Sequence, residues 1–398
     1  GAIFEHCKLD YLNLAKVFFT GARFRSASLQ SCSLAGTNFA GADLSLAKLE
    51  GSDLSGANLA GATLCDVSFK GVKLAGAQFD GADLSRSLFG GVSAVGGSFP
   101  NANFEGAALT KADLSGADLR RARFVRANLR QAALNAANCE RADFTEADLE
   151  MASAVEANFT AARLDGAKLR KMELKRANFL DATGKGISFA EARLLEVDLR
   201  PARFDSANFQ SADFSKAILS RVDLKPHSFA GARFPGADAS EVEAEGVNFT
   251  HADLSLGNFR MADLRRANLS GCRAIDADLS GTMLVGANFR GGNLQDADLR
   301  FARAIGADFT GAVLSGADLA NADLSEAVFK KAKVWGATAR RAKAPRGTAL
   351  VFSLSTMFSK AKQKQTKVSD EKEKARKKRI AKLEAEADKR PPHLTGKR

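Results

Sequence analysis

Residues 41–60 read Gly-Ala-Asp-Leu-Ser-Leu-Ala-Lys-Leu-Glu-Gly-Ser-Asp-Leu-Ser-Gly-Ala-Asn-Leu-Ala, and this stretch repeats a unit of five residues. We call its Leu or Phe the central position and the residue two places earlier, usually Ala, the small position. Central positions recur from Phe4 to Val334 without one insertion or deletion, 67 in all, and 58 of them hold Leu or Phe. A pattern this regular predicts one repeated structural unit rather than ordinary domains.

A period of five fits neither an α-helix, which repeats every 3.6 residues, nor a flat strand, which repeats every two. The small and central positions are two residues apart, so in extended backbone their side chains point to the same side. Glycine often occupies the second residue after the centre, as at Gly41, Gly56 and Gly61, where it allows a turn with positive φ. The sequence therefore predicts short inward-facing strands joined by corners, which is a coiled solenoid.

Units such as Ala42-Asp43-Leu44 and Ala57-Asn58-Leu59 resemble the pentapeptide-repeat family, whose pattern is Ala-(Asp/Asn)-Leu-x-x, over about residues 1–339. The resemblance implies an all-β solenoid, namely a right-handed, four-sided parallel β-helix with four repeats in each coil. It also implies about 17 coils and, at roughly 4.8 Å for each stacked strand, a length of about 80 Å.

Four repeats in a coil would place central residues twenty positions apart in one stacked column. We expect one such core column to contain Phe189, Phe209, Phe229 and Phe249. Gly184 occupies a central position and should mark an irregular coil or an exposed loop.

The basic character of the chain is confined to its C-terminal end. The formal net charge is +12, yet residues 340–398 hold 19 Lys and Arg against 6 Asp and Glu. We therefore divide the chain into a β-helix (1–339), a linker with a capping helix (340–361) and a basic charged tail (362–398).

Apolar residues follow at helical spacing after the last repeat, and we expect a short helix over 349–361 that caps the final coil. These residues are Leu350, Val351, Leu354 and Phe358. A helix placed on a partner or on a membrane surface is the alternative.

The tail contains a basic run that predicts contact with an anionic partner of residues 360–398, either an acidic protein surface, nucleic acid or anionic lipid. The residues concerned are Lys374, Arg376, Lys377, Lys378, Arg379 and Lys382. A solvated charged helix and a nuclear import signal are the other interpretations. The absence of aromatic residues from 359–398 argues against stacking on single-stranded bases.

Catalytic and metal-binding patterns are missing from the repeats. The five cysteines show no CxxC spacing, and only Cys65 should point outward. His227 takes a small position after Pro226, where we expect a kink that turns the ring outward. No nucleophile–base pair, phosphate loop or dinucleotide fingerprint is present, so we expect no enzyme activity, no metal and no cofactor.

One outward column mixes both signs of charge, because Arg123, Arg163 and Arg303 share it with Asp83 and Asp263. We favour a self-neutralising face over a dedicated anion-binding stripe.

We expect a non-catalytic scaffold of a larger assembly, with protein subunits as partners. The alternatives are a nucleic-acid mimic that modulates a type II topoisomerase such as gyrase, and a secreted host-interaction effector. No apolar run is long enough to span a bilayer, and no signal peptide is apparent. Free cysteines favour a reducing intracellular compartment, first the cytoplasm, or an organelle if a targeting segment has been removed.

Overall fold

The computed structural model describes residues 1–225 and 227–343. These fall into two compact units. Unit 1 contains residues 1–192 and 201–205, and the described part of unit 2 contains residues 193–200, 206–225 and 227–343. The expected capping helix (349–361) and the basic tail (362–398) lie outside the described residues.

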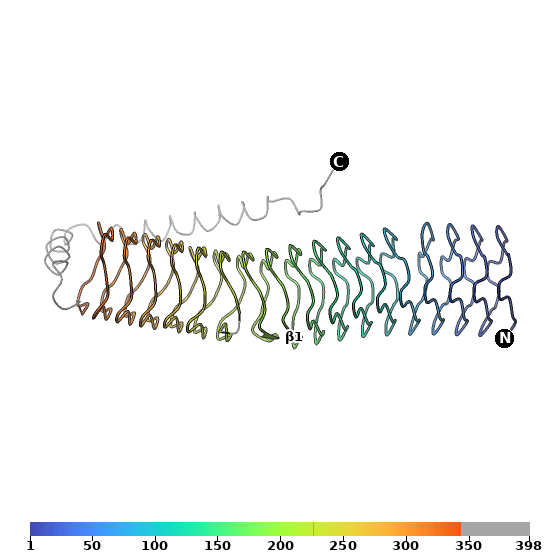
Figure 1. Cartoon of the computed structure of the whole chain (residues 1–398), viewed down its shortest axis with the longest axis horizontal. Helices are drawn as coiled ribbons and strands as arrows, with labels where there is room; N and C mark the ends of the chain where they lie inside the picture. Colours follow the sequence, from blue (N-terminus) through green and yellow to red (C-terminus); the bar gives the residue numbers. More distant parts are fainter. Residues whose placement is uncertain (226, 344–398) are drawn as a thin grey trace, which may run out of the picture. The chain divides into compact units, whose positions relative to one another are not determined.

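Within each unit the backbone winds in coils of twenty residues (Figure 1). The residue directly before each centre, which we call the bridge position, pairs in parallel with the residue twenty positions later. Arg23 pairs with Asp43 in unit 1, and Asn288 pairs with Asp308 in unit 2. Four repeats therefore make one coil in both units, as the family resemblance implied.

Two named strands occur in the described residues, both in unit 1. Strand β1 (Thr183–Lys185) pairs in parallel with strand β2 (Arg203–Asp205), and Gly184 lies opposite Phe204. Gly184 is buried in β1, so the exposed-loop alternative for this position is wrong. A Cβ on Gly184 would lie 2.7 Å from Cδ1 of Ile187, so the Ile187 side chain fills the space that a large central residue would occupy.

Central and small positions line one apolar interior in each unit. Phe124 and Ala122 are fully buried, and the Phe124 ring stacks between those of Phe104 and Phe144 with both centroid distances 4.9 Å. Stacked rings one coil apart follow from the spacing between parallel strands, which is about 4.8 Å. The core is thus built from columns that run from coil to coil.

The expected column of phenylalanines is divided between the two units. In unit 2 the Phe229 ring stacks on Phe209 at 5.2 Å and on Phe249 at 5.5 Å. Phe189 belongs to unit 1, where it is fully buried and its ring centroid lies 5.5 Å from that of Phe204.

The two residues after each centre form the corner positions, and among the described residues the second of them adopts positive φ, glycine or not, except at Pro201. Gly56 has φ of 66° and Met261 has φ of 59°. The N–H of each donates to a carbonyl of the next coil, from Gly56 to Ala75 at 2.8 Å and from Met261 to Ser280 at 2.9 Å. This ladder offsets the strain of the left-handed conformation, which is about 1–2 kcal/mol for a residue with a side chain.

Asp and Asn recur at the bridge position because their side chains close the following corner. Oδ1 of Asp43 accepts the backbone N–H of Ser45 at 2.9 Å, and Oδ1 of Asn58 accepts that of Ala60 at 3.0 Å. Such turns satisfy a backbone donor that the coil would otherwise leave open. The many carboxylates of the repeat therefore have a structural role.

Candidate docking surfaces

In described coils that have a coil on either side, only the bridge position and the two corner positions of each repeat point outward and can meet a ligand. Among residues 1–225 and 227–343, no three His, Cys, Asp or Glu side chains are grouped so as to hold a metal ion. None of those residues forms a helix with the length and apolar content to cross a membrane. Binding chemistry must therefore be sought on the outer surface of the coils.

Cys65 lies in a polar cluster on unit 1. Its thiol donates to Oδ2 of Asp83 at 3.0 Å, and the Ser85 hydroxyl donates to its sulfur at 3.2 Å. Burial, followed by the hydrogen bond and charge of Asp83, raises the pKa of the Cys65 thiol despite the opposing hydrogen bond from Ser85. A thiol with a raised pKa stays protonated at neutral pH, so this cluster does not present an activated nucleophile.

Asp83 should make the stability of unit 1 sensitive to acid. Burial alone would raise its pKa, but hydrogen bonds from Cys65, Ser85 and Asn103 hold the pKa below its ordinary value of 3.8. A lowered folded-state pKa gives stability that is complete above 3.8 and is lost as the pH falls through the folded-state pKa. We expect Asp83→Asn to flatten part of the loss of unfolding free energy as the pH falls below 3.8. Denaturant titrations at several pH values would measure this, and parallel curves for both proteins would contradict it.

The other cysteines do not form a reactive site. Cys32, Cys139 and Cys272 are buried, and burial raises the pKa of Cys272 to about 12. Cys7 is exposed although it occupies a small position, because it lies in the first described coil.

His227 does not turn away from the core, and our expectation of an outward ring is wrong. Its ring packs edge-on against Phe209, with a centroid distance of 5.6 Å, and against Phe229 at 6.2 Å. Its Nδ1 accepts the backbone N–H of Ala207 at 3.1 Å. The imidazole thus takes the place of the usual Ala, and its Nδ1 supplies the acceptor for the backbone N–H of Ala207.

The mixed column of Arg and Asp is largely self-neutralising. Arg123 pairs with Glu105 at 3.1 Å, and Arg163 pairs with Asp165 at 2.6 Å. Arg303, in the same column of unit 2, differs because no carboxylate among residues 1–225 and 227–343 lies within 4.0 Å of its guanidinium.

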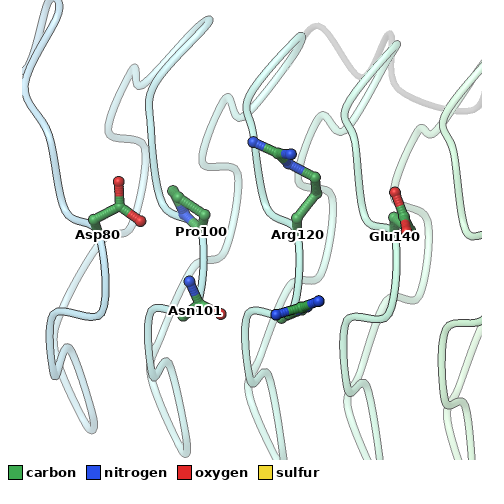
Figure 2. Close-up of a pocket in the computed structure, with 6 residues that line it drawn as sticks. Asp80, Pro100, Asn101, Arg120 and Glu140 are labelled. Atoms are coloured by element: carbon green, nitrogen blue, oxygen red, sulfur yellow. The ribbon is translucent and has the colours of Figure 1, made fainter.

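A cavity of about 360 Å³ opens on the corner positions of unit 1. Figure 2 shows Asp80, Pro100, Arg120 and Glu140 on four successive coils, with Asn101 beside Pro100. Nε of Arg120 donates to Oδ1 of Asp118 at 2.8 Å, and its second nitrogen donates to Oδ2 at 2.6 Å. That guanidinium fork holds the pKa of Asp118 below its usual range.

The cavity lies beside Pro100 and Asn101, whose side chains are shorter than those of Arg120 and Arg121 on the following coil. Its lining balances Asp80 and Glu140 against Arg120 and Arg121. A balanced, open depression of this size suits one side chain of a protein partner better than a polyanion.

Large apolar side chains occupy outward positions that hold polar residues or glycine in most repeats. In unit 1 they include Leu88, 54% exposed, and Val95, 57% exposed. In unit 2 they include Met261, 57% exposed, and Phe301, 62% exposed. The core does not need these exposed apolar groups, so they are candidate positions for contact with another molecule.

The sequence-predicted tail residues and capping residues all lie outside the described part of the chain, so their placement stays a prediction. The exposed apolar residues were not singled out from the sequence. A search for apolar residues at bridge and corner positions would have found them, because those positions are polar or glycine in most repeats.

The chain is thus a repeat solenoid with a sequestered apolar interior and a variable outer surface. A family profile described as "Pentapeptide repeat region" matches residues 22–99. One described as "Pentapeptide repeats" matches eight further segments, residues 89–124, 122–160, 155–183, 185–225, 228–260, 262–300, 293–330 and 307–343. The chain belongs to the pentapeptide-repeat family, whose members fold as right-handed β-helices.

Solved structures similar to this chain include other pentapeptide-repeat proteins. HetL, involved in regulating heterocyst differentiation in the cyanobacterium Nostoc, is 24% identical, with 79% of this chain and 90% of HetL covered and a TM-score of 0.14. Full-length QnrB1, a plasmid-mediated fluoroquinolone resistance protein, is 21% identical, with 57% and 93% covered and a TM-score of 0.20.

A pentapeptide-repeat protein of the Arabidopsis thaliana thylakoid lumen is 24% identical, with 35% of this chain and 69% of that protein covered and a TM-score of 0.11. No curated protein matches the chain. Because these TM-scores are low, the family assignment rests on the repeat profiles.

Proposed function

We propose that this chain is a non-catalytic scaffold of a larger assembly, on which protein subunits dock along the outward positions of about 17 coils. The exposed apolar side chains at outward positions, Leu88 and Val95 in unit 1 and Met261 and Phe301 in unit 2, carry the proposal. Each leaves apolar surface in water at a cost of about 25 cal/mol per Å², which a docked partner would remove.

The basic tail would anchor the scaffold. Its run from Lys374 to Lys382 offers charge for an acidic surface, and surface charge of this kind speeds association more than it adds affinity. We also propose a reducing intracellular compartment, first the cytoplasm, which the five free cysteines favour.

Mimicry of DNA is less well supported. A protein that imitates DNA must present free carboxylates in series. In unit 2, Asp263 is bound by Arg265 and Asp298 is bound by Arg300, both at 2.6 Å, so these negative charges are already compensated.

Photo-crosslinking in the native source would test the scaffold role. A benzophenone amino acid at Leu88 or at Phe301 should give discrete adducts with proteins, whereas the same probe at Glu146, a polar corner residue, should give few. Absence of protein adducts at both apolar positions would contradict the proposal.

The anchoring role of the tail needs a separate variant. Changing Lys374, Arg376, Lys377, Lys378, Arg379 and Lys382 to Gln in the full chain should reduce the yield of the same adducts. Unchanged yields would show that these charges do not anchor the protein.

A further inference from the structure

We infer that an apolar strip on unit 2, formed by Met261, Met283 and Phe301, binds a short acidic segment of a protein partner through one apolar anchor residue. The inference rests on the proposed docking function and names the chemistry of the partner.

The strip follows the corners of three successive coils. The N–H of Met261 donates to Ser280, that of Gly281 to Arg300 at 2.7 Å, and that of Phe301 to Ala320 at 3.0 Å. Met261, Gly281 and Phe301 therefore stack one coil apart. At about 4.8 Å for each coil, the strip is about 10 Å long.

Gly281 forms the floor of the strip. A Cβ on Gly281 would lie 2.5 Å from Sδ of Met261, so the thioether lies directly over this glycine and leans toward the coil that carries Phe301. Met283, two residues after Gly281, is half-exposed on the adjoining face and pairs with Asp263 and Arg303 through the bridge ladder. Methionine adapts its shape to a partner, so the strip suits an inserted apolar side chain.

The packing of unit 2 does not require these side chains. The central positions of the same coils are filled by Leu264 and Leu284, both fully buried. In the same corner column, Glu241 and Asn321 occupy the places that precede and follow the strip, and both are exposed polar residues. The backbone therefore accepts polar residues at these corners, and the apolar residues serve contact with another molecule.

Two guanidinium groups beside the strip are uncompensated. Arg260 and Arg303 are exposed, and no carboxylate within the described ranges 1–225 and 227–343 lies within 4.0 Å of either one. The neighbouring Arg265 and Arg300 are instead bound to carboxylates at 2.6 Å. The free charge at the strip is positive, and guanidinium groups bind carboxylates through paired hydrogen bonds.

The dimensions favour a peptide over a broad surface. About 10 Å corresponds to three residues of extended chain, which places an apolar residue between two acidic ones. Asp263, Asp298 and Asp323 border the strip, but each is paired with a cation, namely Arg265, Arg300 or Lys343. Arg260 and Arg303 are therefore the charges left to bind a narrow acidic segment.

A random twelve-residue peptide library displayed on phage and selected on the full-length protein would test the inference. We expect enriched peptides to contain an apolar residue between acidic ones. Their affinity should fall about tenfold or more with Met261→Ser and Phe301→Ser together, and again with Arg260→Glu and Arg303→Glu together. Leu46→Ser, an exposed apolar change at a corner of unit 1, is the matched control and should leave the affinity unchanged.

Enriched peptides that lack acidic residues, or that bind all variants equally, would overturn the inference, as would a selection that enriches nothing. Phosphatidylserine vesicles are the second probe. Vesicle binding that requires Met261 and Phe301 would assign the strip to a membrane instead. If the strip binds no peptide while crosslinks at Leu88 persist, the scaffold role stands and only the assignment of this strip falls.

Discussion

Replacing Phe229 by Ala is expected to lower the free energy of unfolding of its part of unit 2 by about 3–5 kcal/mol. The fully buried ring touches a ring on either side along its column, Phe209 at 5.2 Å and Phe249 at 5.5 Å. It also meets Phe214 and Phe234 across the interior, both at 5.8 Å. Removing it would leave a cavity closed by stiff coils that have little freedom to collapse.

Amide hydrogen exchange would locate this effect. In a solenoid each coil contacts only its neighbours, so protection should fall in the coils around Phe229 and persist far from it. Phe229→Leu is the matched control and should cost less than about 1.5 kcal/mol, because the same column already holds Leu at position 269. A loss below about 1 kcal/mol for the Ala variant would mean that Phe229 does not fill a continuous core.

The sequence alone predicts the interior of this protein well, because the central and small positions of every five-residue repeat are expected to face inward. Leu59, Phe104 and Phe209 occupy central positions, which the spacing predicts to face inward, and they are 0%, 0% and 2% exposed. The coil of twenty residues also follows from the family pattern, and the bridge ladder confirms it.

Spacing could not predict which way the residues that break the repeat would point, because that direction depends on one neighbouring group. Gly184 avoids a void since Ile187 fills it, and His227 stays against the core since Ala207 offers a backbone N–H. Likewise, Arg163 and Arg303 are equivalent in register, yet only Arg163 has an acid two residues later, Asp165, to bind it. The repeats therefore differ from one another mainly in their outward side chains, and the function of the chain must be sought there.

Deleting residues 105–124, one whole coil of unit 1, is expected to leave a folded protein whose remaining coils keep their protection. The deletion joins Phe104 to Val125 and restores the register of every column. Asn103, which bridges to Arg123, would meet Asp143 instead, and the Phe104 ring would stack on Phe144 in place of Phe124.

Deleting residues 105–125 removes one residue more and should have a far larger effect. Only three residues, 126–128, would then lie between the centres Phe104 and Leu129 instead of the usual four, so one corner would lose a position that donates to the next coil. Each side of a coil needs five residues both to point its small and central side chains inward and to keep its backbone hydrogen bonds to the next coil. With one residue missing, Ala127 and Leu129 could not both face the interior while those hydrogen bonds stayed intact. We expect a loss of at least about 3 kcal/mol, from displaced core and unpaired buried backbone groups. Hydrogen exchange should show it as lost protection around the junction, and equal behaviour of the two deletions would contradict a core that depends on every fifth residue.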